Sequence, residues 1–73
     1  MPKITLKAAR VNANLTQAEM AEKMGVSRDS VAKWETGRAK ILAIHLFKFC
    51  EVTGVSADNI SLPESSTNRR QEG

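Results

Sequence analysis

The chain has 73 residues and a mass of 8.0 kDa, which allows one small domain with a thin core, because a chain of this size buries roughly 60% of its unfolded surface. Hydrophobic residues make up 41% and charged residues 26%, an ordinary globular composition that excludes a collagen-like, low-complexity or wholly disordered chain. The net charge of +3 and the isoelectric point of about 9.4 are compatible with a polyanionic partner but do not identify one.

The chain lacks the covalent and metal cross-links of small secreted proteins. Its single cysteine, Cys50, cannot form an intrachain disulfide, and no motif supplies the other ligands of a zinc site, so we expect no metal and no cofactor. The longest apolar-rich stretch, residues 41–50, is too short to cross a membrane, and the N-terminus lacks the apolar run of a signal peptide. We therefore expect a cytoplasmic protein without membrane contact.

Residues 63–73 differ in composition from the rest of the chain. They are polar and carry as many acidic as basic side chains, so the positive surplus belongs to residues 1–62. Such a composition cannot offset the entropy lost on ordering the chain. The sequence thus predicts one folded domain over residues 1–62 and a disordered tail over residues 63–73.

Turn signals divide the domain into five short segments. No window shows the alternation of a half-buried strand, so we predict an all-α domain of five helices. Thr5 is placed to cap a first helix that runs to about Ala13, and Asn14 can adopt the left-handed conformation that ends it.

The second helix has the clearest start in the chain. Thr16 and Glu19 form a capping box, in which each side chain bonds the backbone N–H of the other residue. Gly25 can end this helix after about two turns. Its apolar positions share one face, and they are Met20, Ala21 and Met24.

Two longer segments follow after a three-residue turn. Ser27 is a good N-cap for a third helix that ends at Gly37, and a fourth helix is predicted over residues 41–53, closed by Gly54. A last helical turn or two follows Ser56. The positions expected to face the core are Val31 and Trp34 in the third helix, and Ala43, Leu46, Phe49, Cys50 and Thr53 in the fourth.

These residues carry a family resemblance. The run LTQAEMAEKMGVS at residues 15–27, followed by WETG at residues 34–37, resembles the helix-turn-helix of the lambda-repressor and Cro superfamily, in its xenobiotic-response-element branch. A second GVS at residues 54–56 extends the resemblance, which covers about residues 5–62. It implies a compact lambda-repressor-like domain that binds double-stranded DNA and regulates transcription.

The resemblance implies that the helix over residues 28–36 enters the major groove. Arg28, Asp29 and Lys33 lie on its outward side and are the base-reading candidates. Arg28 and Lys33 can donate to guanine, whereas Asp29 can accept from cytosine or brace Arg28. An acid in a first helical turn also favours the helix dipole, and a surface lysine also suits simple solvation, so both keep a purely structural interpretation.

The resemblance also assigns roles outside the reading helix. Gln17, at the start of the second helix, is expected to bind a DNA phosphate through its side chain and backbone N–H. An arginine of the first helix commonly pairs with the glutamate that ends the third, which here joins Arg10 to Glu35 in a structural ion pair. The weaker phosphate candidates are Ser27, Ser30, Arg38 and Lys40.

The fourth helix departs from the family pattern. Apolar Ile41 and Leu42 stand where Pro-Ser is usual, and with Ile44 and Phe47 they lie partly off the core stripe. Surplus apolar surface on a small domain predicts a homodimer interface, unless the core is unusually thick. His45 is expected at the surface or in that interface, and Cys50 is expected to act as a small hydrophobe.

The chain has too few of the side chains and motifs that enzymes use for catalysis. There is no tyrosine, one histidine, one cysteine and no phosphate-binding glycine loop. We therefore predict a sequence-specific DNA-binding regulator, of the compact repressor type found in phages and mobile elements, that binds a near-palindromic operator as a homodimer. The alternatives are an antitoxin with a toxin as its protein partner, and a helical interaction module.

Overall fold

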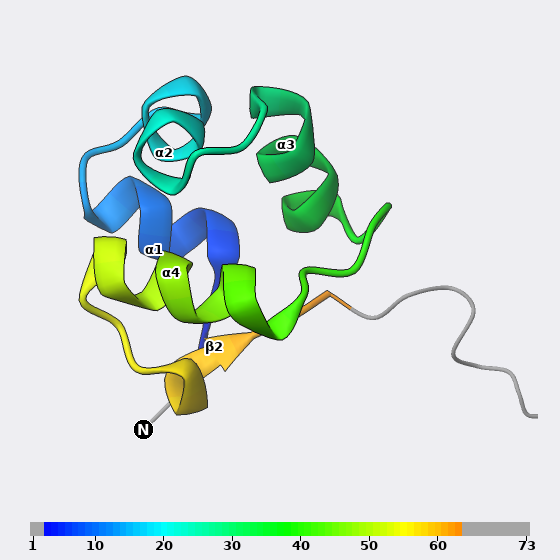
Figure 1. Ribbon diagram of the computed structural model, residues 1–73. Helices are drawn as coiled ribbons and strands as arrows, with labels where there is room; N and C mark the ends of the chain where they lie inside the picture. Colours follow the sequence, from blue (N-terminus) through cyan, green and yellow to red (C-terminus); the bar gives the residue numbers. More distant parts are fainter. Residues whose placement is uncertain (1–2, 64–73) are drawn as a thin grey trace, which may run out of the picture.

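The computed structural model describes residues 3–63, and Figure 1 shows their arrangement. In this range, four α-helices, a single 3₁₀ turn and a pair of two-residue strands enclose one small core. The elements in chain order are β1 (Ile4–Thr5), α1 (Leu6–Asn12), α2 (Gln17–Met24), α3 (Arg28–Thr36), α4 (Ala43–Thr53), η1 (Ala57–Asn59) and β2 (Ile60–Ser61).

The first three helices begin at the caps that the sequence predicts. The Thr5 hydroxyl accepts from the backbone N–H of Ala8 at 3.0 Å. The capping box of α2 is complete, because Glu19 N–H donates to Thr16 Oγ1 at 3.0 Å and Thr16 N–H donates to Glu19 Oε1 at 2.9 Å. Ser27 caps α3 by accepting from the N–H of Ser30 at 3.1 Å. These bonds satisfy N–H groups that the first turn of a helix leaves unpaired.

A residue with a left-handed backbone conformation lies at the end of each of the four helices. Asn14 has a φ of 62°, as predicted, and Gly25, Gly37 and Gly54 close α2, α3 and α4. Gly25 matters most for the site, because its φ of 74° turns the chain sharply enough for Val26 N–H to bond Ala21 carbonyl at 3.0 Å. The turn between α2 and α3 is therefore short and held by hydrogen bonds.

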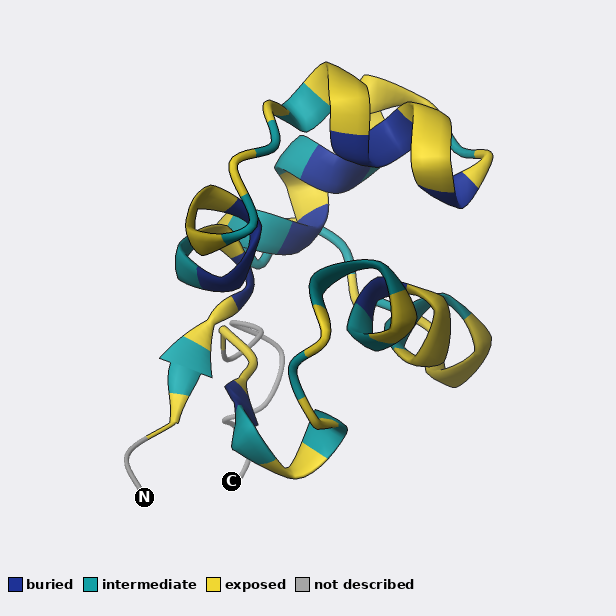
Figure 2. Cartoon of the chain, turned by 90° about the vertical axis from the view of Figure 1, so that its left-hand side faces the viewer, coloured by how far each residue is buried: buried dark blue, intermediate teal, exposed yellow. Residues whose placement is uncertain are grey.

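The core lies between the four helices, as the burial colours of Figure 2 show. α2 packs against both α3 and α4, and α1 also contacts both of them. The predicted inward positions of α2 and α3 are confirmed, with Ala21 only 4% exposed. The buried apolar residues are Leu6, Ala9, Met20, Ala21, Met24, Val31, Trp34, Phe49 and Ile60.

The prediction for the fourth helix is wrong at its start. Leu42 has an extended backbone with φ −72° and ψ 155°, so α4 begins at Ala43, and Ala43 is exposed rather than inward. Phe49 is buried, while the other predicted inward positions, Leu46, Cys50 and Thr53, are half-buried. The reason is that apolar residues surround much of this helix, so their spacing does not fix its rotation.

The five-helix, strand-free prediction also needs correction. The expected fifth helix is the single 3₁₀ turn η1, and it leads into β2, which pairs in parallel with β1. Ile4 lies opposite Ile60, which is 5% exposed, so the pair covers the open end of the core. Strands of two residues are too short to show an alternating pattern, and their pairing joins segments from the two ends of the described sequence.

Two further predictions concern the C-terminal tail and membrane crossing. The predicted disordered tail lies outside the described residues, apart from Pro63, which is exposed. Among residues 3–63, no helix combines the length and the apolar character that a membrane crossing needs.

Candidate nucleic-acid interface

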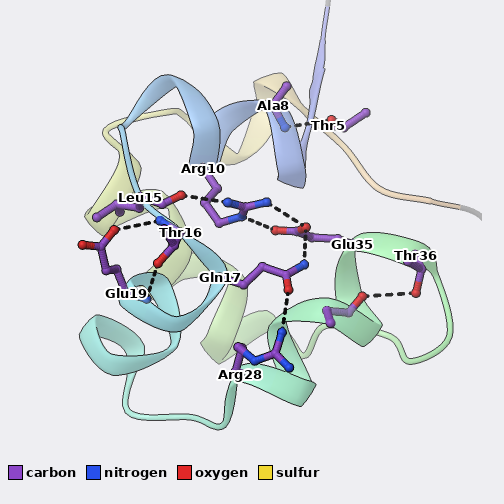
Figure 3. A network of polar contacts seen from close by, with 11 residues as sticks. Thr5, Ala8, Arg10, Leu15, Thr16, Gln17, Glu19, Arg28, Glu35 and Thr36 are labelled. Carbon is purple, nitrogen blue, oxygen red and sulfur yellow. Dashed lines mark hydrogen bonds and ion pairs between the residues drawn. The ribbon is translucent and has the colours of Figure 1, made fainter.

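A buried ion pair joins the ends of α1 and α3 (Figure 3). Arg10 Nε donates to Glu35 Oε2 at 2.6 Å and Arg10 Nη2 donates to Glu35 Oε1 at 3.2 Å. The third arm of the guanidinium, Nη1, donates to the carbonyl of Leu15 at 2.7 Å, in the loop that leads to α2. The two side chains are 9% and 4% exposed. The pairing that the family resemblance implied is confirmed, and the contacts of Arg10 connect α1, α3 and the loop before α2.

Gln17 extends this ion pair toward the surface, an arrangement not predictable from the sequence. Its Nε2 donates to Glu35 Oε1 at 3.0 Å, and its Oε1 accepts from Arg28 Nη1 at 3.3 Å. Figure 3 shows the Gln17 amide lying between the two charged groups. The predicted phosphate-binding side chain thus belongs to an internal chain of contacts, Arg10–Glu35–Gln17–Arg28. No sequence pattern reports these distances, because the four residues come from three different helices.

The three predicted base-reading residues are all exposed on α3. Asp29 Oδ2 pairs with Lys33 Nζ at 3.2 Å, with side chains 73% and 48% exposed, while Arg28 bonds Gln17 instead. The predicted brace between Asp29 and Arg28 is therefore replaced by an Asp29–Lys33 pair. The separation of four residues on one helix was the signal for that pair. Asp29 also lies in the first turn, where an acid favours the helix dipole.

The weaker phosphate candidates lie at both ends of α3. The hydroxyls of Ser27 and Ser30 are 3.0 Å apart, so both serve the start of the helix. Arg38 and Lys40 are exposed in the loop that follows the helix. The backbone N–H of Arg38 donates to Lys33 carbonyl at 2.9 Å, which holds the start of this basic loop against α3.

A separate apolar surface lies at the start of α4. Leu42, Ile44 and Phe47 are 61%, 72% and 64% exposed, which argues against the alternative of a thick core. Ile41, the fourth predicted interface residue, is half-buried and packs partly against the core. We call Leu42, Ile44 and Phe47 the apolar surface below.

His45 and Cys50 lie on the inner side of the same helix. His45 is half-buried rather than at the surface, with its ring centroid 5.1 Å from that of Trp34, and its Nδ1 is buried with no hydrogen-bond partner among residues 3–63. Cys50 is half-buried, and this burial raises the pKa of its thiol above the ordinary value. Over the described range, no three His, Cys, Asp or Glu side chains converge as metal ligands.

A model of the helix-turn-helix family matches residues 6–60, from the start of α1 to the first residue of β2. The chain belongs to the Cro/C1-type helix-turn-helix family. This family consists of DNA-binding regulators, and its members are not typically enzymes. No curated protein matched the chain in a sequence comparison.

In this Cro/C1-type domain, removal of one partner of the buried ion pair tests its structural role. We expect Arg10→Met to lower the free energy of unfolding by about 3 to 5 kcal/mol, because it leaves the Glu35 carboxylate buried without its countercharge. Urea unfolding followed by circular dichroism measures the change.

The exposed pair Lys48–Glu51 provides the matched control. Its atoms lie 3.8 Å apart with side chains 50% and 75% exposed, so Lys48→Ala should cost less than about 1 kcal/mol. If Arg10→Met is no more destabilising than Lys48→Ala, the ion pair does not hold the helices together.

Proposed function

We propose that the protein is a sequence-specific double-stranded DNA-binding repressor whose α3 lies in the major groove. One observation carries the proposal: α2, the Gly25 turn and α3 form a packed pair whose outer side presents Arg28, Asp29 and Lys33 to solvent. In a helix-turn-helix, the second helix of such a pair contacts base edges with its N-terminal residues while the first crosses the backbone.

The chemistry of the exposed residues fits the major groove. Arg28 and Lys33 can donate to O6 and N7 of guanine, and Asp29 can accept from N4 of cytosine. Asp29 and Lys33 already pair with each other, so they present a donor and an acceptor to neighbouring bases as one unit. Arg28 lies in the first turn of α3, at the end that enters the groove in this family of motifs.

Phosphate contacts would flank this reading surface. The start of α2 offers the backbone N–H of Gln17, and the start of α3 offers the Ser27 and Ser30 hydroxyls. The loop after α3 adds two positive charges, Arg38 and Lys40. Repression requires only that the protein occupy its operator, and this surface suffices for that. From the family resemblance we infer a compact repressor of the type found in phages and mobile elements.

We further propose that the protein binds a near-palindromic operator as a homodimer through the apolar surface. Three large apolar side chains that are more than half exposed are costly to leave in water on so small a domain. A second copy is the occupant we favour, because one small module makes few contacts with DNA and a symmetric pair doubles them. An antitoxin function, with a toxin covering the same surface, is the competing interpretation.

Salt dependence and sequence selection test DNA binding. If a dimer neutralises about six to ten phosphates, the logarithm of the affinity should fall with the logarithm of salt concentration with a slope of roughly −5 to −9. Selection from random duplexes should return one preferred, near-palindromic sequence. A flat salt response, or bound duplexes with no shared sequence, would contradict the proposal.

Phe47→Asp tests the dimer. A charge within the apolar surface should weaken self-association while the helical signal is kept, since Phe47 is 64% exposed in the single chain. Val11→Asp is the matched control, because Val11 is 51% exposed on α1, outside the apolar surface. Analytical ultracentrifugation measures association with and without operator DNA. A wild-type monomer under both conditions rules out the homodimer and leaves the surface to a different protein.

A further inference from the structure

The amide of Gln17 lies between two groups of opposite hydrogen-bonding character. The ionised carboxylate of Glu35 can only accept hydrogen bonds, and the guanidinium of Arg28 can only donate them. Gln17 has one donor end and one acceptor end, so a single orientation satisfies both neighbours: Nε2 toward Glu35 at 3.0 Å and Oε1 toward Arg28 at 3.3 Å. The carboxylate therefore determines which end of the amide reaches Arg28.

We infer that Glu35 is a positioning residue for base reading, which acts on Arg28 through the amide of Gln17. This inference rests on the proposed function, in which Arg28 contacts a guanine. Glu35 is suited to the role because its side chain is 4% exposed and Arg10 holds both of its oxygens, at 2.6 and 3.2 Å. The amide is thus fixed by a group that solvent and DNA do not reach.

The contact leaves Arg28 free to read a base. A guanidinium has five N–H donors, and the bond from Nη1 to Gln17 uses one, so the edge formed by Nε and Nη2 remains available for O6 and N7 of guanine. An exposed arginine otherwise samples many rotamers, and a side chain held in place before binding loses less entropy when it contacts the base. Fixing Arg28 in advance should strengthen discrimination at its base position.

This role for Gln17 differs measurably from a simple phosphate contact. A residue that only contacts the phosphate weakens binding to all sequences alike, because phosphates carry no sequence information. A residue that positions Arg28 instead changes the preference at the one base position that Arg28 reads, and its effect depends on the presence of Arg28. The two roles therefore predict different base-preference profiles for the same variant.

The experiment compares profiles from randomised duplex DNA for wild type, Arg28→Ala, Gln17→Met and the double variant. Gln17→Met removes the amide at similar size and leaves the Arg10–Glu35 pair intact. We expect it to relax the preference at the Arg28 position by about 2-fold or more, the lower range for coupling between residues in contact. Without Arg28 the amide has no side chain to orient, so the double variant should match Arg28→Ala at that position.

Glu35→Gln tests the buried end of the chain of contacts. A neutral amide can donate or accept, so it no longer fixes the orientation of Gln17, and the same base position should lose preference. Arg10→Lys is the matched control, because it weakens the same ion pair but keeps the carboxylate beside Gln17. It should lower stability in urea and keep the wild-type profile. Should Glu35→Gln fail to fold, Gln17→Met still tests the inference, because it removes the amide through which Glu35 would act on Arg28.

The outcomes separate this inference from the function on which it rests. A wild-type protein without any preferred sequence contradicts both. A wild-type preference that survives Gln17→Met unchanged, with affinity lowered equally for all sequences, overturns the inference alone and makes Gln17 a phosphate contact. An equal change of profile in Arg10→Lys and Glu35→Gln also overturns it, because general loosening of α3 then explains both.

Discussion

The carboxylate of Glu35 is the point at which the first three helices meet. Burying this charge is costly, and the cost is offset because Arg10 and Gln17 together donate three hydrogen bonds to its two oxygens. Arg10 also bonds the carbonyl of Leu15, so the loop before α2 is held by the same guanidinium. The orientation of α3 relative to α1 and α2 therefore depends on one satisfied polar cluster as well as on apolar packing.

This arrangement distinguishes an end with hydrogen-bonded charged residues from an end with exposed apolar side chains. At the reading end, α2 and α3 are joined by the Gly25 turn, and Arg28 is connected through Gln17 to the buried ion pair. At the other end, α4 begins without a side-chain cap and leaves the apolar surface exposed. In the proposed function, the charged face contacts DNA and the apolar surface contacts a second protein chain.

The sequence predicts best what depends on residues close together in the chain. The caps of Thr5, Thr16 and Ser27 were predictable because each bond spans three residues. The β1–β2 pair and the rotation of α4 were not, because both depend on contacts between distant segments. In the site, the resemblance supplied the Arg10–Glu35 pair, whereas the position of Gln17 between two charged groups required the tertiary structure.

Methylation interference at guanine N7 tests most directly whether α3 reads the major groove through Arg28. Methylation removes the acceptor that an arginine would contact, and N7 lies in the major groove only. The account predicts that one methylated guanine in each half-site blocks the wild-type protein and has no effect on Arg28→Ala. An identical interference pattern for both proteins, or no guanine that interferes with either, would contradict it.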